Sequence, residues 1–185
     1  LAPGTSYQDL NREAAAVAPG AEGLFFLPYL SGERTPHPDP LARGCFCGLT
    51  LRHGRGHMAR AVMEGVGFGL RDALEIMRNL GIRPQRIIAS GGGAKSELWR
   101  QILADIFDTQ IVTLNVNEGA AYGAAALASV GVGAHASIES VCDNWLQETS
   151  LTKPSGARDS YEASYPIYAD LYPRLKPVFE ATSKL

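Results

Sequence analysis

Cysteine is scarce in this sequence, and no metal-binding motif is present. Three cysteines, Cys45, Cys47 and Cys142, occur among 185 residues, and an odd number without paired spacing does not predict a disulfide framework. We therefore expect a protein of a reducing compartment, the cytoplasm. Cys45 and Cys47 are too close together for a zinc knuckle, and the four histidines form no H-E-x-x-H motif. We expect no metal site.

The sequence also lacks an excess of either charge and a long apolar run. Lysine and arginine total 17, aspartate and glutamate total 19, and the net charge is −2. No basic field would attract nucleic acid or an anionic membrane. The longest apolar stretches, 24–30 and 120–130, are shorter than the ~20 residues that span a bilayer. We therefore expect a soluble protein with no nucleic-acid or membrane partner.

An initiator methionine is missing as well. The chain begins at Leu1, and we expect it to be a piece of a longer protein. Hydrophobic residues make up 45% of the chain, which is sufficient to form one packed core.

The most regular pattern in the sequence lies over residues 57–80. Apolar side chains recur there at spacings of four and three, which predicts a long helix with one apolar face. That face carries Met58, Val62, Val66, Leu70, Leu74 and Met77. Gly65, Gly67 and Gly69 lie within the helix and cost roughly 1 kcal/mol each relative to alanine. We expect a closely packed neighbouring backbone to offset that cost.

The remaining segments alternate between helical and strand patterns, as in parallel α/β sheets. Helices are predicted over 10–17, 96–107 and 119–130, and strands over 23–30, 46–51, 86–90 and 110–114. The polar segments 31–43 and 148–160 are predicted to be a loop and a surface connection. Tyrosines at spacings of three and four predict a terminal amphipathic helix from Tyr161, which Pro166, Pro173 and Pro177 should kink or segment.

A glycine triplet separates the strand predicted over 86–90 from the helix predicted over 96–107. The first N–H groups of a helix have no partner within the helix, and glycines let an anion approach them. Lys95 could add a positive charge and Ser96 could cap the helix, so the segment predicts a phosphate site with free amides at the helix start. A tight turn without a ligand explains the triplet equally well. Neither the Walker loop nor the dinucleotide fingerprint matches it.

Two longer motifs resemble a known family. Gly44-Cys-Phe-Cys-Gly48-Leu49, seven further residues and then His57-Met58-x-x-Ala61-Val62-Met63-Glu64 match the second signature of the FGGY carbohydrate kinases at every defined position. Residues 88–96, with Trp99-Arg100-Gln101 after them, resemble the nucleotide loop and helix of that family. Residues 118–125 resemble its small-residue helix. The similarity extends from about residue 23 to the terminal tyrosine helix.

The resemblance implies a fold and cofactors. FGGY kinases have two actin-like (ribonuclease-H-like) domains around a cleft, so residues 1–185 would be part of the C-terminal, nucleotide-binding domain, an α/β domain with a mixed sheet flanked by helices. The N-terminal domain would be absent from this chain. ATP, Mg²⁺ and a small-molecule sugar are the implied partners. The oligomeric state stays open, a homodimer included.

The resemblance also implies which residues bind the nucleotide. These are Gly91, Gly92, Gly93, Ala94 and Glu97, with Gly92 and Gly93 facing the phosphates and Ala94 against adenine. Glu97 stands where relatives often have asparagine, and a carboxylate there would repel the phosphates unless it reaches only the base or ribose. The catalytic aspartate and the D-x-G-T phosphate loop of the family precede the start of this chain, so no catalytic residue is assigned within it.

One segment indicates which sugar is the substrate. Leu30-Ser-Gly-Glu33-Arg34-Thr35-Pro36-His37 is most similar to the xylulose kinases of that family, which implies phosphorylation of a ketopentose, D-xylulose to D-xylulose 5-phosphate. We expect the isolated chain to be inactive. The alternative interpretation of the segment is a rigid, proline-braced loop in which Glu33 and Arg34 pair with each other or with a neighbour.

Other residues have simpler interpretations. We expect Arg71 and Asp72 to form a structural pair, and Asp105 and Asp108 to be solvated or to cap a helix.

Three other functions stay open. The protein could be an FGGY kinase for another sugar or polyol, or a non-catalytic actin-like binding module. A nicotinamide-dependent oxidoreductase would need a further glycine and an acidic residue about 20 positions beyond the turn, a distance near which Glu118 lies.

Overall fold

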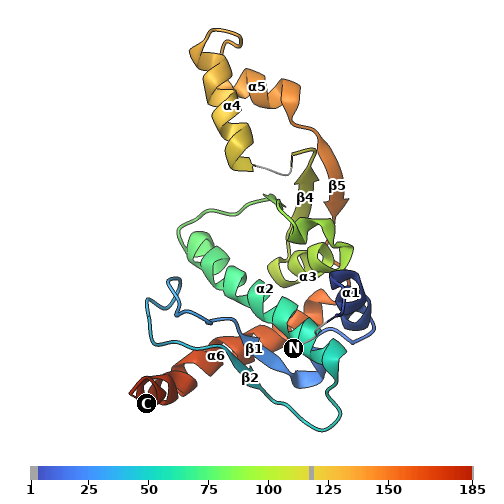
Figure 1. Cartoon of the computed structure of the whole chain (residues 1–185), viewed down its shortest axis with the longest axis vertical. Coiled ribbons are helices and arrows are strands. Elements are labelled where there is room, and N and C mark those ends of the chain that lie inside the picture. Colours follow the sequence, from blue (N-terminus) through green and yellow to red (C-terminus); the bar gives the residue numbers. More distant parts are fainter. Residues whose placement is uncertain (1–3, 117–118, 185) are drawn as a thin grey trace.

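Two helices of 25 residues, α2 (Arg55–Asn79) and α6 (Arg158–Thr182), pack together in the larger part of the molecule (Figure 1). The computed structural model describes residues 4–116 and 119–184. The other elements, in chain order, are α1 (Tyr7–Ala15), the 3₁₀ turn η1 (Ala21–Gly23), β1 (Phe25–Leu27), β2 (Cys45–Cys47), β3 (Arg86–Ile88), the 3₁₀ turn η2 (Gly93–Lys95), α3 (Glu97–Phe107), β4 (Gln110–Leu114), α4 (Gly119–Gly131), α5 (Ile138–Trp145) and β5 (Glu148–Thr152). No helix in the described part of the chain is both long and apolar enough to cross a membrane.

The strands form two separate sheets. β1 and β2 make an antiparallel pair, and the second sheet has the order β3-β4-β5, with β3 parallel and β5 antiparallel to β4. The mixed sheet confirms the predicted α/β class. β1, β2 and β3 are shorter than predicted, with three residues each.

The surface connection predicted over 148–160 was wrong. Its first residues form β5, and its last ones begin α6. β5 is polar because it is an edge strand with exposed side chains, and its hydroxyls bond to its neighbour: Thr113 Oγ1 lies 2.6 Å from Ser150 Oγ on β5. A polar strand of this kind gives no apolar signal in the sequence.

The tyrosine stripe of α6 forms much of the core, as predicted. Tyr161, Tyr168, Tyr172 and Phe179 are buried, together with Phe68 of α2 and residues of α3. The three prolines do not segment the helix, which runs unbroken from residue 158 to 182. Burial of one side of the helix outweighs the backbone hydrogen bonds that the prolines remove.

The side of α2 that is buried is not the apolar face that the sequence predicts. Leu74 is buried, but Leu70 and Met77 are exposed, and Met58, Val62 and Val66 are only half-buried. The buried side instead carries polar residues together with Ala61 and Phe68; the polar ones are Arg60, Glu64, Arg71 and Asp72. They are hydrogen-bonded to α6 and to the segment after α1, as burial of charge requires.

Close packing accounts for two of the three helix glycines. A Cβ on Gly65 would overlap the Phe26 carbonyl oxygen of β1, which confirms the expected backbone approach at this position. At Gly67 the near group is a side chain, with Ile106 Cδ1 at 2.7 Å from the Cβ position. At Gly69 the nearest atom, the Tyr168 hydroxyl at 3.4 Å, is at ordinary contact distance.

Alanine at position 65 is therefore expected to destabilise the protein. Gly65→Ala should gain about 1 kcal/mol of helix propensity but lose about 1–3 kcal/mol or more from overpacking against β1. Gly123→Ala in α4, where a Cβ meets nothing within 4 Å, is the control and should stabilise by up to about 1 kcal/mol. Urea unfolding measures both, and equal effects of the two substitutions would contradict the close approach.

Candidate nucleotide site

The glycine turn follows the carboxyl end of β3 and leads into η2 and α3. Gly91 has φ +82°, a backbone conformation that favours glycine. Gly92 has φ −61° and ψ −39°, which any residue adopts. A Cβ on Gly92 would meet nothing within 4 Å, whereas one on Gly93 would lie 3.3 Å from Trp99 Nε1. Neither the backbone nor the packing requires glycine at position 92, so its surface is open to an external group.

The backbone donors of this turn are free. Among the described residues, none accepts a hydrogen bond from the amides of Gly91, Gly92, Gly93 and Ala94. The next amides are taken, since Lys95 N–H donates to Gly92 O at 3.3 Å and Ser96 N–H to Gly93 O at 3.0 Å.

One of the amides predicted to be free at the start of the longer helix is occupied, and further free amides lie in the turn before it. Ser96 caps α3, and its Oγ accepts from Trp99 N–H at 3.2 Å. The amide of Trp99 is therefore occupied, and the cap removes one donor that we expected to be free. The four free amides precede that cap and form a compact set of donors suited to an anion.

Arg100 holds the turn against α3. Its Nη1 donates to the carbonyl of buried Ala94 at 2.6 Å, and its Nε is buried with no acceptor among the described residues. In the sequence, Arg100 is notable only as part of the segment Trp99-Arg100-Gln101, which resembles the FGGY nucleotide helix. Its contact with the turn depends on the bend between η2 and α3, which no spacing rule anticipates.

A mostly apolar cavity of about 420 Å³ lies next to the turn. Its walls come from the carboxyl ends of β3 and β4 and from α4 and α5, with Ile88, Ser90, Leu114, Tyr122, Leu127 and Cys142 among them. The Tyr122 hydroxyl is buried and has no partner in the described part of the chain. A flat apolar group with one hydrogen-bonding edge, such as a purine, suits these walls. Sequence analysis included Tyr122 only within the small-residue helix 118–125 and assigned it no role, because an isolated tyrosine gives no signal.

Comparison with known proteins decides the family. The model for the C-terminal domain of the FGGY family of carbohydrate kinases matches residues 3–132. The chain belongs to the FGGY family.

Its relatives include proteins that are named for two different substrates, xylulose and gluconate. The chain is 41% identical over 172 residues to the xylulose kinase of Staphylococcus epidermidis, covering 92% of this chain and 35% of that protein. The structure of a ligand-bound xylulose kinase from Lactobacillus acidophilus superposes with a TM-score of 0.88 at 33% identity, covering 96% of this chain and 36% of that one. A gluconate kinase from the same organism gives the same TM-score and identity, with 97% and 37% covered. The chain thus spans about a third of the length of these relatives.

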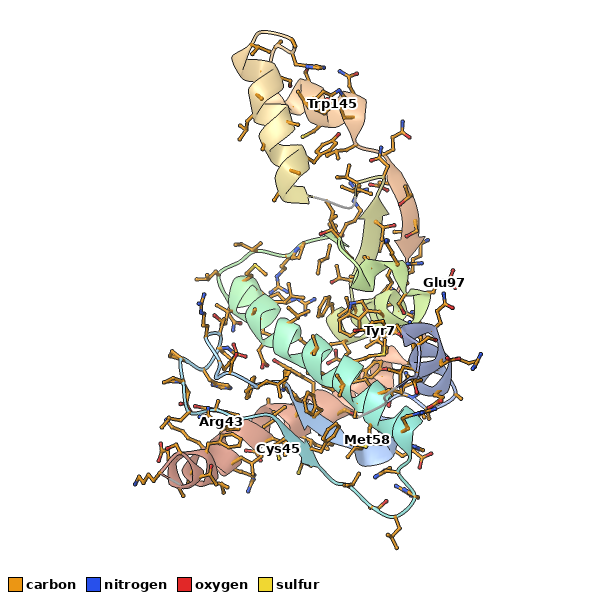
Figure 2. All side chains as sticks on the ribbon, in the orientation of Figure 1. Tyr7, Arg43, Cys45, Met58, Glu97 and Trp145 are labelled. Carbon is orange, nitrogen blue, oxygen red and sulfur yellow. The ribbon has the colours of Figure 1, made fainter. Side chains whose placement is uncertain are left out.

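Glu97 is the one predicted nucleotide contact that lies outside the glycine turn. It is exposed in the first turn of α3 (Figure 2). A carboxylate there interacts favourably with the positive end of the helix dipole, so its position has a structural explanation as well. Its role toward a nucleotide stays a prediction. Glu118, weighed for a nicotinamide site, lies outside the described residues.

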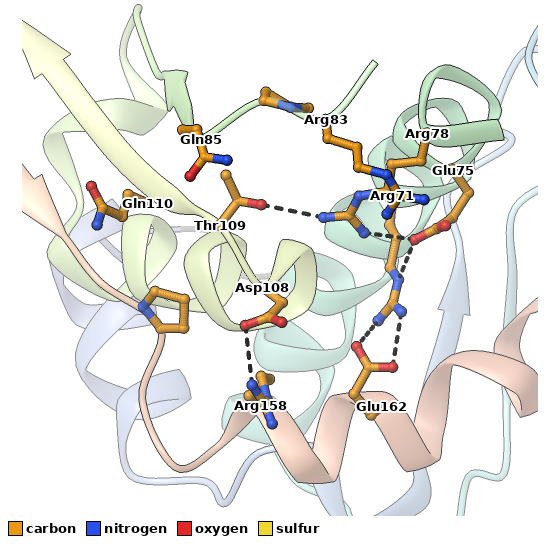
Figure 3. A pocket seen from close by; sticks show the side chains of 12 residues that line it. Arg71, Glu75, Arg78, Arg83, Gln85, Asp108, Thr109, Gln110, Arg158 and Glu162 are labelled. Atoms are coloured by element: carbon orange, nitrogen blue, oxygen red, sulfur yellow. Dashed lines mark hydrogen bonds and ion pairs between the residues drawn. The ribbon is translucent and has the colours of Figure 1, made fainter. Parts of the chain in front are cut away.

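A second, polar cavity of about 800 Å³ lies at the opposite ends of β3 and β4 (Figure 3). Three of its arginines are neutralised: Arg71 pairs with Glu162 at 2.8 Å, Arg78 with Glu75 at 2.8 Å and Arg158 with Asp108 at 3.4 Å. These ion pairs join α2, α6 and the end of α3, and we interpret the cavity as structural.

Two sequence predictions about charged residues were wrong. Arg71 and Asp72 pair with α6 rather than with each other, since Arg71 reaches Glu162 and Asp72 accepts from the Tyr165 hydroxyl at 2.7 Å. Adjacent residues on a helix point in different directions, which explains the error.

Asp105 is neither solvated nor a helix cap. It is 2% exposed and accepts from Gln101 Nε2 at 3.1 Å and Ser155 Oγ at 3.0 Å. It thereby anchors the loop before α6. Asp108, by contrast, is the C-cap residue of α3.

The segment 31–43 is a braced loop. The Glu33 carboxylate accepts from the backbone N–H groups of Arg34 at 2.7 Å and Thr35 at 2.9 Å instead of pairing with the Arg34 side chain. Buried Asp39 accepts from the Tyr172 hydroxyl at 2.8 Å, and the ring of His37 stacks on Tyr172 at 3.9 Å between centroids. Arg34 is exposed and has no ion-pair partner among the described residues.

The Tyr172 contact predicts an alkaline transition. Burial, and then the hydrogen bond to Asp39, raises the pKa of Tyr172 from 10.0 to about 12. Because this hydroxyl deprotonates more easily in the unfolded chain, its contribution to stability is complete below pH 10 and is lost as the pH rises to about 12. In Tyr172→Phe, the free energy of unfolding should fall less steeply over that window. Tyr7→Phe, at an exposed position, is the control. If the free energy of unfolding falls with pH in parallel for the unsubstituted protein, Tyr172→Phe and Tyr7→Phe, the prediction is contradicted.

Proposed function

We propose that the protein of which this chain is part transfers the γ-phosphoryl group of ATP to a ketopentose, D-xylulose to D-xylulose 5-phosphate. In this proposal the turn of Gly91, Gly92, Gly93 and Ala94 binds the phosphates. Ala94 is thereby moved from the adenine, where the resemblance placed it, because it is buried and is not among the residues that line the apolar cavity. The apolar cavity beside it receives the adenine, with Tyr122 in reach of its polar edge. The observation that carries the proposal is the set of four consecutive amides without a protein acceptor at an open glycine turn.

This arrangement suits phosphoryl transfer, which requires positioning and charge neutralisation more than covalent chemistry. Backbone N–H groups bind phosphate oxygens without adding a titratable group, and Arg100 keeps the turn in place through the Ala94 carbonyl. Lys95, which is exposed in η2, can add a positive charge. The residue that accepts the proton of the sugar hydroxyl is expected outside this chain.

Sugar kinases use ATP together with Mg²⁺. When bound, the ion would neutralise part of the negative charge of the phosphates. The described residues contain no group of three or more His, Cys, Asp or Glu side chains that could hold a metal ion. We assign no step of the reaction to Mg²⁺ through them.

The identity of the sugar rests on the xylulose kinase relatives and on the braced loop 31–43. The equal similarity to a gluconate kinase favours a second candidate, an FGGY kinase for another sugar or polyol. A non-catalytic module would keep the fold and lose turnover, so an assay distinguishes it from both kinases.

A substrate panel tests the reaction. We expect the full-length protein to release ADP from ATP with D-xylulose at a kcat/KM at least about 100-fold above that with D-gluconate or glycerol, a ratio that polar contacts to substrate hydroxyls can supply. A preference for D-gluconate would support the second candidate, and no turnover with any of them would support the binding module. The 185-residue chain alone should give no turnover.

The glycine turn is tested by adding one carboxylate. Gly92→Asp should raise the KM for ATP at least about tenfold, because each 1.4 kcal/mol of repulsion is worth a factor of ten. Its melting temperature should be unchanged, since a Cβ at this position meets no neighbour. Gly156→Asp, also in open space but before α6, is the matched control. An unchanged KM for ATP in Gly92→Asp would exclude the turn as the phosphate site.

A further inference from the structure

The polar cavity at the far ends of β3 and β4 has groups that its structural ion pairs do not use. Its walls come from the ends of α2 and α3, the start of α6 and the residues at the start of β3 and β4 (Figure 3). Its volume of about 800 Å³ is within the range of small-molecule sites. The glycine turn follows the other end of β3, so this cavity is separate from the candidate nucleotide site.

The cavity carries more positive than negative charge. Four arginines and three carboxylates line it. Each carboxylate already has an arginine partner: Glu162 pairs with Arg71, Glu75 with Arg78 and Asp108 with Arg158. The fourth arginine, Arg83, has no ion-pair or hydrogen-bond partner among the described residues. One positive charge of the cavity is therefore left without a counter-charge.

The direction of the Arg83 side chain is a second observation. Arg83 lies on the segment between α2 and β3. Figure 3 shows its guanidinium group extended toward that of Arg78, instead of away from the cavity. Two guanidinium groups repel each other at short range, and a solvent-exposed arginine is free to avoid such an approach. Cations that converge in a cleft attract an anion.

Two neutral side chains of the cavity are also unused. Gln85 and Gln110 line it, and within the described part of the chain neither side-chain amide forms a hydrogen bond. A side-chain amide both donates and accepts hydrogen bonds, as a hydroxyl group does. The unused groups of the cavity are thus one guanidinium group and two amides, which suit an anion that also carries hydroxyl groups.

We propose that this cavity is a second anion site, which binds the phosphate group of a small phosphorylated polyhydroxy compound at Arg83. The planar guanidinium group matches two oxygens of a phosphate at once, and the excess positive charge favours an anion. Gln85 and Gln110 would bind the hydroxyl groups. The three ion pairs stay in place and hold the walls. The site goes beyond the proposed kinase function and does not depend on it.

Calorimetric titration of the full-length protein with D-ribose 5-phosphate tests the site. We expect a Kd below about 1 mM, and binding of D-ribose, which lacks the phosphate, at least about tenfold weaker. Arg83→Ala should weaken binding of the ester at least about tenfold, since each 1.4 kcal/mol is a factor of ten. Arg86→Ala is the matched control, because Arg86 is exposed, pairs with Glu148 and does not line the cavity. Equal affinities of the two variants, or no binding of the ester, would overturn the proposal.

Two further titrations identify the source of the phosphate and separate the cavity from the glycine turn. If inorganic phosphate binds as tightly as the ester and Arg83→Ala weakens both, the anion site is supported and its occupant is the free ion. Gly92→Asp should bind the ester as the unsubstituted protein does. Loss of ester binding in Gly92→Asp but not in Arg83→Ala would place the ester in the turn and overturn the proposal. Absence of kinase turnover has no bearing on these measurements.

Discussion

A buried ion pair within α2 organises this chain. Glu64 Oε1 accepts three hydrogen bonds, from Arg60 Nε at 2.7 Å, from the Tyr161 hydroxyl at 2.8 Å and from Gly20 N–H at 3.0 Å. Burial raises the pKa of Glu64, and Arg60 opposes that rise. Two buried charges are tolerated because each is paired and hydrogen-bonded. The network joins α2 to α6 and to the segment after α1.

This network determines which side of α2 faces the core. With Arg60 and Glu64 directed inward, Gly65 allows β1 to approach closely, and α6 places its tyrosines over Phe68. The apolar side must then face outward. The polar core of the chain and its exposed apolar side thus have one cause.

The candidate nucleotide site lies on the other sheet, where β3 ends. Its donors are backbone amides, whose directions are fixed by the capped α3 and by Arg100. No charged side chain of the turn has to move to bind an anion. Such a site is preorganised, which reduces the cost of binding.

Sequence patterns located most of the elements and the glycine turn. The periodicities of 57–80, 96–107 and 110–114, the Ser96 cap and the tyrosine stripe all correspond to elements in the structure, because these signals are local. The strand at 148–152 was missed, because its polarity comes from its place at the edge of the sheet. Arg100 and Tyr122 lie within motifs that resemble the family, but no local pattern indicated their roles, since these depend on contacts across the fold.

By itself, the sequence determined the secondary structure that local periodicity controls, the family through its long motif, and the glycines able to admit an anion. Only the tertiary structure decided which amides are free, since that depends on where Ser96, Gly92 and Gly93 direct their acceptors. It also decided that α2 buries Arg60 and Glu64 and exposes Leu70. Periodicity identifies the two sides of a helix, but only packing against α6 and the segment after α1 selects the side that is buried.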